Sequence, residues 1–151
     1  TREYLSVEPT IADGERIASL VILDELPKSL VNPPVQIDAL IGTLRPVFVW
    51  DNYEFGYYQF PVIARDPGDR EFVGKFYTAK VFELYEPPEA VDKKLAALDS
   101  VLESNHDKID VMLVWGRDPR VEKVIEQWFD PTPFFENGRI RAYRNRSKTK
   151  A

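Results

Sequence analysis

The segment from Ile109 to Phe129 constrains the fold more than any other part of this sequence. It begins with the nearly continuous apolar run Ile109-Asp-Val-Met-Leu-Val-Trp115, and such runs are typical of strands covered on both faces. In the following Gly-Arg-Asp-Pro, Asp118 can cap a helix and Pro119 can occupy its first position. Apolar residues then recur at helical spacing, at Val121, Val124, Ile125 and Trp128. A strand, a tight turn and a helix packed back on the strand are therefore predicted.

Two further segments favour an α/β arrangement. Residues 16–23 form a second nearly continuous apolar run, which predicts another strand covered on both faces. Residues 89–103 are predicted to be a helix, because their apolar residues follow helical spacing: Val91, Leu95, Leu98 and Leu102. Pro88 and Glu89 suit the first turn of that helix, where an acidic group meets the positive end of the helix dipole.

Shorter elements complete the predicted pattern. Residues 35–44 fit a short helix, and residues 46–50 fit a short strand. Residues 72–76 and 81–85 are interpreted as edge-type or irregular strands. The segment 134–143 is a predicted hairpin, because Asn137-Gly138 supplies the positive φ angles that a two-residue turn needs.

These elements predict one α/β domain spanning residues 1–151. The expected fold is a small layered sandwich with a mixed β-sheet, about three helices and a C-terminal β-hairpin. We expect residues 1–14 to form an extended arm and residues 144–151 to form a frayed basic tail. The alternative is an α+β domain in which the aromatic segment that follows residue 50 forms a β layer of its own.

Composition excludes several kinds of chemistry. The net charge of −5 argues against nucleic acid as a partner, because phosphate binding needs a basic face. The chain contains no cysteine, which removes disulfides, thiolate catalysis and cysteine-ligated metals together. His106 is the only histidine, so a transition-metal site would depend on carboxylates. We therefore expect no metal, no cofactor and no catalytic residue in this chain.

The aromatic segment that begins at Trp50 is the predicted ligand-binding surface. Aromatic rings beside amide and carboxylate groups suit a sugar, because a ring face stacks on the pyranose while polar side chains hydrogen-bond its hydroxyls. The candidate residues are Trp50, Asp51, Asn52, Tyr53, Glu54, Tyr57 and Tyr58. The competing interpretation is that these rings fill the core or a subunit interface, since aromatic residues contribute large apolar area wherever they lie.

The remaining polar motifs have structural interpretations that we prefer. Asp51 and Glu54 are close enough for an acid/base pair, but acidic residues are abundant in this chain, at 25 of 151. His106 follows a predicted helix, where polar residues are common. Gly116-Arg-Asp-Pro119 lies beyond a strand end, where α/β proteins bind ligands, yet it has one glycine, and Asp118 would repel a phosphate.

Basic residues are concentrated at the C-terminal end of the chain. They are Arg139, Arg141, Arg144, Arg146, Lys148 and Lys150. Such a cluster could contact acidic lipid headgroups or nucleic acid, but a solvated terminus is the more common outcome.

The order of these segments resembles the soluble region that follows the last membrane span of bacterial multi-span glycosyltransferase-like proteins, of the dolichyl-phosphate-mannose mannosyltransferase type. The matching segments are Val49-Trp-Asp-Asn-Tyr-Glu54, Tyr58-Gln-Phe-Pro61, Asp110-Val-Met-Leu-Val-Trp-Gly116 and Phe135-Glu-Asn-Gly-Arg-Ile-Arg-Ala-Tyr143 with Arg144. The resemblance implies a position on the periplasmic or extracellular face of a membrane. No residue here matches the acidic motif credited with sugar transfer in that family, so no catalytic role is implied.

Three hypotheses about function follow. The first is a non-catalytic domain of such a membrane protein that contacts glycan or lipid-linked sugar through the aromatic segment. The second is a self-associating or peptide-binding α/β module, for example a homodimer, with Trp50 to Phe60 as the contact surface. The third is a small stand-alone enzyme that acts on a sugar or nucleotide with Asp51, Glu54 and His106. Without the resemblance, the expected location of the protein is the cytoplasm. The chain begins at Thr1 and its only methionine is Met112, so we expect a domain cut from a longer protein, attached to a membrane only through an upstream segment.

Overall fold

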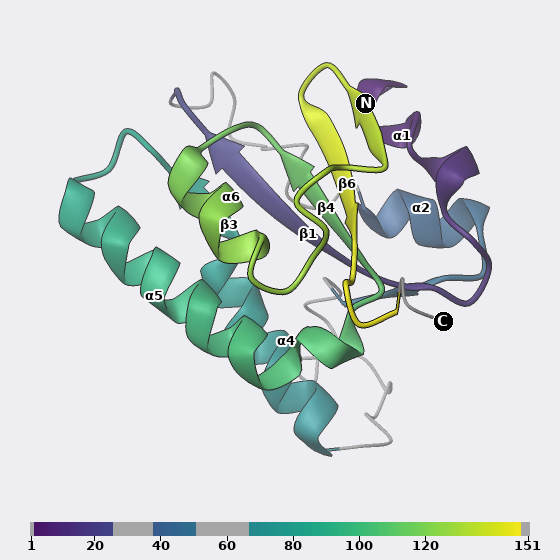
Figure 1. Ribbon diagram of the computed structural model, residues 1–151, viewed down its shortest axis with the longest axis horizontal. Coiled ribbons are helices and arrows are strands. Elements are labelled where there is room, and N and C mark those ends of the chain that lie inside the picture. The colour runs from purple at the N-terminus through teal and green to yellow at the C-terminus, as the bar shows by residue number, and fades with distance from the viewer. Residues whose placement is uncertain (1, 26–37, 51–66, 149–151) are drawn as a thin grey trace.

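A mixed β-sheet with helices on both faces organises the protein. The computed structural model describes residues 2–25, 38–50 and 67–148, and Figure 1 shows the strands crossing the centre of the molecule. Across the sheet the strands are β2 (Phe48–Val49), β1 (Arg16–Leu23), β4 (Val111–Trp115), β6 (Ile140–Arg144) and β5 (Phe135–Asn137). The short strand β3 (Val81–Glu83) also pairs with β1. The α/β class, the mixed sheet and the C-terminal hairpin are as predicted.

The central pair of strands, β1 and β4, is parallel and buried on both faces. Their register runs from Ile17 opposite Val111 to Val21 opposite Trp115. On its other side, β1 pairs in parallel with β2 near its start and with β3 near its end. β6 pairs antiparallel with β4, and β5 pairs antiparallel with β6. Because helices cover both faces of the centre, both strands need apolar side chains at almost every position. This need explains the two continuous apolar runs.

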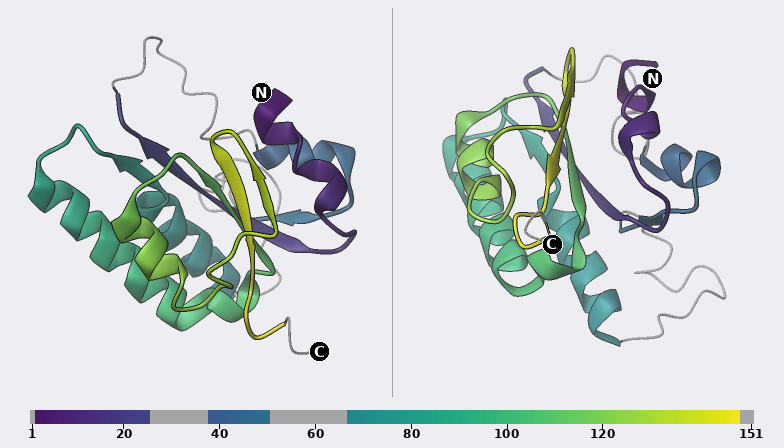
Figure 2. Two further views of the ribbon diagram at one scale, coloured as in Figure 1. Left: turned by 45° about the horizontal axis from the view of Figure 1, so that its top comes forward. Right: turned by 45° about the vertical axis from the view of Figure 1, so that its right-hand side comes forward.

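One helical layer is formed by α4 (Pro67–Ala79), α5 (Pro88–Asn105) and α6 (Pro119–Ile125). The other layer is formed by α1 (Arg2–Leu5), the 3₁₀-helix η1 (Glu8–Thr10) and α2 (Asp38–Leu44), and Figure 2 shows the sheet lying between the two layers. The first layer covers a core that includes Leu20, Met112 and Val114, whereas the second covers Ile17 and Leu113. Alternate residues of the same strands thus face opposite layers.

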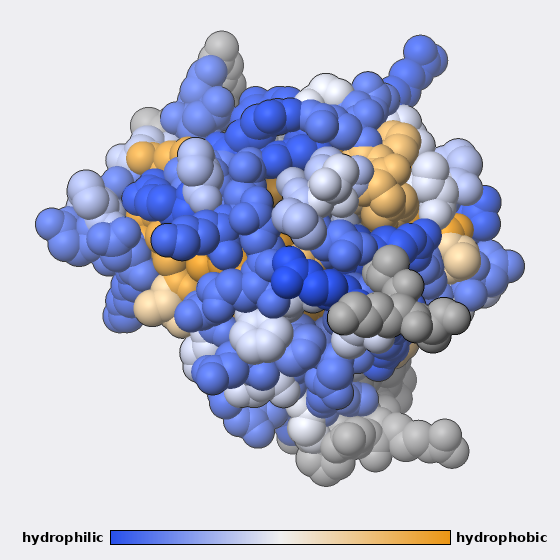
Figure 3. Space-filling view, viewed as in Figure 1, coloured by the Kyte–Doolittle hydropathy of each residue, from blue (hydrophilic) through white to orange (hydrophobic). Residues whose placement is uncertain are grey.

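The polar character of the outer surface is the one expected for amphipathic helices. On the face drawn in Figure 3 the surface is mostly hydrophilic, and apolar atoms appear in separate patches. In α5, the buried residues are Val91, Leu98, Val101 and Leu102, which lie along one side of the helix. The helix predicted at residues 89–103 is therefore confirmed, one residue longer at its start and two at its end.

The helix cap predicted at the start of α6 is confirmed, whereas the predicted hairpin turn is shifted by one residue. The Asp118 carboxylate accepts hydrogen bonds from the backbone N–H groups of Arg120 and Val121, as a helix cap should. In the hairpin Asn137 pairs with Ile140, so the turn residues are Gly138 and Arg139, with Gly138 at φ 57°. Asn137 remains in β5, and its side chain donates a hydrogen bond to Ser6 Oγ at 2.8 Å.

The strand predicted at residues 72–76 is wrong, because this segment lies inside helix α4. The residues that bury against the sheet are Phe72, Val73, Phe76 and Ala79, and their spacing is that of one helix face. Other short elements agree better: α2 covers residues 38–44 of the predicted helix, β2 covers residues 48–49 of the predicted strand, and β3 covers residues 81–83.

The extended arm predicted for residues 1–14 is also wrong. The described residues 2–14 include α1 and η1, and three apolar side chains in this segment are at most 1% exposed: Tyr4, Val7 and Ile11. Their spacing of three and four residues places them on one side of a helical path, where they cover β4 and β6. The Tyr4 ring stacks on Trp115 with 5.9 Å between ring centroids.

Residues 144–148 are ordered parts of the fold rather than a frayed tail, so that prediction is wrong for them. Asn145 is fully buried, forms a bridge to Phe129, and donates side-chain hydrogen bonds to the carbonyls of His106 and Ile109. The Arg146 guanidinium donates to the carbonyls of Glu126 and Phe129. Residues 149–151 lie outside the described residues.

Replacement of Gly116 should destabilise the protein strongly. Gly116 has φ 88°, and a Cβ added there would lie 2.3 Å from the carbonyl oxygen of Ile22. We expect Gly116→Ala to lower the free energy of unfolding by about 2–5 kcal/mol, combining left-handed strain with a backbone collision. Urea denaturation measures this loss.

Gly14→Ala is the matched control for that measurement. Gly14 also has a positive φ, 83°, but nothing lies within 4 Å of an added Cβ. It should cost only the strain of the left-handed backbone, about 1–2 kcal/mol. Equal losses for the two variants would contradict the close approach of Gly116 to β1.

Candidate functional site

The candidate site lies at the carboxyl ends of β1 and β4. The next described helix after β1 is α2, on one face of the sheet, whereas β4 leads into α6 on the opposite face. Adjacent parallel strands whose connections depart to opposite faces leave a crevice between their ends, and open α/β sheets bind ligands in such crevices. The strand order and the positions of the following helices therefore favour a ligand site at this end of the sheet.

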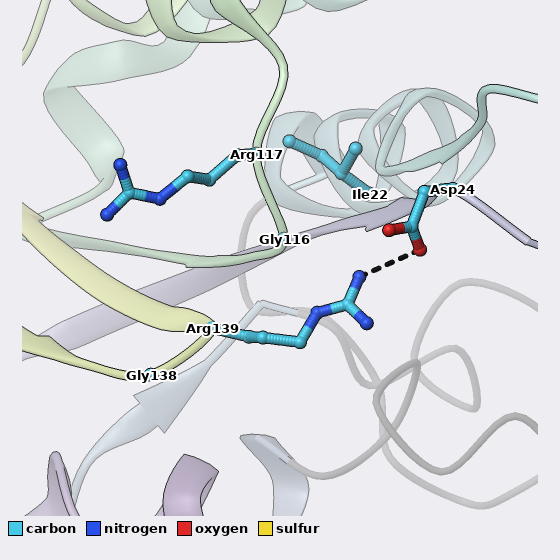
Figure 4. Close-up of a pocket in the computed structure, with 6 residues that line it drawn as sticks. All are labelled: Ile22, Asp24, Gly116, Arg117, Gly138 and Arg139. Atoms are coloured by element: carbon cyan, nitrogen blue, oxygen red, sulfur yellow. Dashed lines mark hydrogen bonds and ion pairs between the residues drawn. The ribbon is translucent and has the colours of Figure 1, made fainter.

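A cavity of about 240 Å³ occupies this crevice. Figure 4 shows the residues that line it: Ile22, Asp24, Gly116, Arg117, Gly138 and Arg139. They come from the end of β1, the loop after β4 and the turn of the β5–β6 hairpin. The backbone N–H of Gly116 donates to the carbonyl of Arg139 at 2.9 Å, which ties the loop to the hairpin. Two of the lining residues are glycines, so part of the wall is backbone without side chains.

The charged groups of the crevice form ion pairs. Arg139 Nη2 lies 2.9 Å from Asp24 Oδ1, and in Figure 4 the Arg139 guanidinium reaches across the crevice to that carboxylate. The hydrogen bond from Arg139 lowers the pKa of the Asp24 carboxyl below its usual value. Arg117 points away from Asp24 in the same view, and it pairs with Glu136 of β5. A carboxylate with a lowered pKa is a weak base, which disfavours a role for Asp24 in general-base catalysis.

A buried arginine supports the loop that forms one wall of the crevice. Arg141 in β6 is 4% exposed, and its Nη2 donates to the carbonyl of Gly116 at 2.6 Å. Its Nη1 donates to Glu122 Oε1 at 2.6 Å and to the Tyr143 hydroxyl at 2.9 Å. Burial raises the pKa of Tyr143, so this hydroxyl stays protonated at neutral pH. The network connects β6, α6 and the loop after β4.

The structure places Trp50 in the core, where it also lines a cavity with Arg16, Phe48, Asp69 and Lys108, and its role in ligand binding stays a prediction. Trp50 is 4% exposed and packs edge-on against Phe72 of α4, with 4.9 Å between ring centroids. Its Nε1 donates a hydrogen bond to the carbonyl of Lys108 at 2.9 Å. The large apolar area of the indole is used between β2 and α4.

The other predicted ligand-binding residues belong to the segment after Trp50. Asp51, Asn52, Tyr53, Glu54, Tyr57 and Tyr58 lie outside the described residues. A role for the aromatic segment therefore stays a prediction. The α+β alternative, which needed this segment to form its own layer, also depends on residues outside the described part.

His106 lies at the end of a helix, as the sequence predicted. It follows α5 directly, its Nδ1 lies 3.0 Å from the carbonyl oxygen of Leu102, and its ring stacks on Trp128 at 4.2 Å between centroids. In the described residues, no group of three or more histidine or acidic side chains is arranged to hold a metal ion.

The basic C-terminal cluster is occupied by contacts within the fold. Arg144 pairs with Glu15 and lies over the Phe134 ring, Arg141 is buried as described, and Lys148 pairs with Asp110. Arg139 belongs to the crevice. Lys150 lies outside the described residues.

Sequence reasoning missed Asp24 and Arg139 as site residues, although weak signals exist. Asp24 directly follows the buried run at 16–23, and Arg139 directly follows the hairpin glycine. Each position is ordinary alone, because acids often follow strands and basic residues often flank turns. Only the pairing of β1, β4 and β6 brings the two residues to one crevice.

The protein was compared with known protein families, with curated proteins and with solved structures, and none of these comparisons finds a match. Among the described helices, none is both long enough and apolar enough to cross a membrane.

A second charged cluster stabilises the opposite end of the central strands. Asp110 accepts hydrogen bonds from the backbone N–H of Arg16 at 2.8 Å and from its guanidinium at 3.1 Å, and it also pairs with Lys148. Burial raises the pKa of the Asp110 carboxyl, but the bonds from Arg16 and Lys148 outweigh burial and lower the pKa from 3.8 to about 2. Asp110 therefore joins the start of β1 to the start of β4.

Stability should depend on pH through Asp110. A carboxyl whose pKa is lower in the folded state stabilises the fold above its unfolded pKa, and this stabilisation is lost as pH falls from about 4 to about 2. After allowance for solvent screening, we expect Asp110→Asn to lower the free energy of unfolding by about 1–2 kcal/mol at pH 7. Denaturant titrations between pH 7 and pH 2 measure the difference, which should shrink over that window.

Asp92→Asn is the control for this experiment. The Asp92 side chain is 69% exposed and lies 3.8 Å from Arg120, so its replacement should change stability by no more than about 0.5 kcal/mol at any pH. A constant difference between wild type and Asp110→Asn down to pH 2 would show that the Asp110 cluster is not the cause.

Proposed function

We propose that this chain is a non-catalytic domain of a membrane glycosyltransferase-like protein, and that it contacts glycan or lipid-linked sugar. The observation that carries the proposal is the crevice between β1 and β4, which has the topology of a ligand site but lacks catalytic machinery among its described lining residues. Its ionisable groups are Asp24, Arg117 and Arg139. The hydrogen bond from Arg139 lowers the pKa of the Asp24 carboxyl, which disfavours proton exchange by this group at neutral pH. Charged groups of this kind bind and orient a ligand.

The segment resemblance over residues 15–144 supports the same proposal from the sequence. It supplies the membrane-protein context and the sugar class. Trp50 and β2 anchor the start of the aromatic segment against α4 and the first strand of the sheet. The tyrosines that follow are the residues we expect to stack on a sugar ring.

Glycan binding should depend on the aromatic segment. We expect the double substitution Tyr57→Ala and Tyr58→Ala to weaken binding of the tightest glycan found in a glycan-array screen by about tenfold or more, because each lost ring removes a stacking surface. Isothermal titration calorimetry with that glycan gives the affinity of each variant.

Tyr85→Ala is the matched control for the tyrosine substitutions. Tyr85 is 37% exposed, follows β3 and donates its hydroxyl hydrogen bond to Glu83 at 2.8 Å. It should leave glycan affinity unchanged. A wild-type protein that binds no glycan on the array, or a double variant that binds as tightly as wild type, would contradict the proposed function.

Self-association is a second candidate, favoured by two exposed apolar side chains on α2. Leu40 and Leu44 are 43% and 60% exposed, respectively. They are four residues apart and so lie on the same side of the helix, and neighbouring exposed apolar side chains are typical of surfaces that contact another molecule. This candidate places the contact on residues other than the aromatic segment.

Sedimentation velocity at several concentrations tests this candidate. If the protein self-associates through α2, Leu44→Glu should raise the dissociation constant by about tenfold or more, because a charge would be buried at the contact. Tyr85→Glu, which adds a charge elsewhere, should not. A wild-type protein that is monomeric at every concentration removes this candidate.

A further inference from the structure

The arrangement of charge in the β1–β4 crevice carries a more specific inference. We propose that this crevice binds an oxyanion, a phosphate or carboxylate group of a ligand, and that Arg139 holds the oxyanion in the place now taken by the Asp24 carboxylate. The inference deepens the proposed function and rests on it for the ligand class. A lipid-linked sugar would supply phosphate, and an acidic glycan would supply carboxylate.

Arg139 is held in position before any ligand arrives. Its backbone N–H donates to the carboxylate of Glu3 in α1, and its carbonyl accepts from Gly116. Its guanidinium lies over the Trp115 ring at 5.7 Å from the centroid. Contacts to α1, β4 and the loop after β4 therefore fix the backbone and limit the side chain. A prepositioned donor loses less conformational freedom when it binds a ligand.

In its contacts with described residues, the Arg139 guanidinium uses little of its hydrogen-bonding capacity. Within the described part of the chain it makes one side-chain hydrogen bond, from Nη2 to Asp24 Oδ1 at 2.9 Å. A guanidinium has five N–H donors and binds carboxylate and phosphate groups through two parallel bonds. The present single bond is thus weaker than the bidentate geometry that a ligand oxyanion could form.

The Asp24 carboxylate marks the anion position. Its side chain is 62% exposed, and exposed ion pairs contribute little to stability because water screens them. When a ligand oxyanion enters, Asp24 gives up the bond from Arg139 and keeps the hydrogen bonds from the backbone N–H groups of Asp24 and Glu25. A doubly charged phosphate then gains more from the same guanidinium than a single carboxylate does.

The walls of the crevice suit a compact charged group. Gly116 and Gly138 both have left-handed backbones, with φ 88° and φ 57°, and neither carries a side chain into the space. The cavity of about 240 Å³ is large enough for a phosphate or carboxylate group with part of a sugar. Arg117, 62% exposed at the same opening, pairs with Glu136, so its charge is balanced there and Arg139 is the residue that binds the anion.

Titration with inorganic pyrophosphate and with glucuronate tests the inference and separates the two sources of the oxyanion. Binding is followed through the backbone amide resonances of Gly116 and Arg139 in ¹H–¹⁵N spectra at low salt. We expect saturable shifts at both residues with at least one probe. Shifts with pyrophosphate alone assign a phosphate ligand, and shifts with glucuronate alone assign an acidic sugar. An absence of saturable shifts with both probes would overturn the inference.

Two substitutions with opposite expected effects make the test independent of folding defects. Arg139→Gln should weaken binding by about tenfold or more, whereas Asp24→Asn should tighten it by about threefold or more, because the competing carboxylate is removed. Arg45→Gln is the matched control: Arg45 pairs with Glu8 and Asp13 away from the crevice, and its loss should change affinity less than twofold. Unchanged affinity in Asp24→Asn would overturn the displacement of Asp24.

Failure of this inference is distinguishable from failure of the proposed function. Neutral glycans on the array do not need an oxyanion site, so their binding can persist when both anionic probes fail. Conversely, pyrophosphate binding that depends on Arg139, without glycan binding that depends on Tyr57 and Tyr58, would retain the site and reject the sugar-contacting role of the aromatic segment.

Discussion

The parallel pairing of β1 with β4 is the interaction on which the rest of the structure depends. Each strand is covered on both faces, so the pair organises two separate apolar cores. Its amino end is joined by Arg16 and Asp110, across the first residues of both strands. Its carboxyl end is closed by the approach of Gly116 to the Ile22 carbonyl, where no side chain fits. Helices α4, α5 and α6 pack against one side of this pair, and α1 and α2 pack against the other.

The candidate site is a consequence of this pairing and of the route of the chain around it. Because α2 and α6, the described helices that follow β1 and β4, lie on opposite faces, a crevice remains beside the carboxyl ends of these two strands. The β5–β6 hairpin then brings Arg139 to the opening, and buried Arg141 holds the loop after β4 through the Gly116 carbonyl. Charge in this region is balanced in pairs, Asp24 with Arg139 and Glu136 with Arg117. In a site built from paired charges, a ligand anion can take the place of a carboxylate. Such an exchange serves ligand binding and not catalysis.

Local sequence signals predicted the elements whose formation depends on neighbouring residues. The apolar runs at 16–23 and 109–115, the helix at 89–103 and the Asp118 cap were predicted correctly because propensity, spacing and capping act within a few residues. The errors have a common cause. The segment with Phe72 and Phe76 has the composition of a strand, and residues 2–14 have the composition of a polar arm. Each is helical in the structure, because its apolar side chains lie along one side of the helix and pack against the sheet. Trp50, which the sequence predicted to bind a ligand, is 4% exposed and packs in the core.

The sequence by itself determined the α/β class, the two central strands and the turn chemistry at Asp118, because each depends on short-range sterics, hydrogen bonding and periodicity. The tertiary structure alone decided which charges meet. Asp24 and Arg139 are 115 residues apart in the chain, and Arg16 and Asp110 are 94 apart. Their contact requires the strand order and register of the whole sheet. The same requirement turned the basic C-terminal end into internal ion pairs, since a partner's position in space is a property of the complete fold and not of the local sequence.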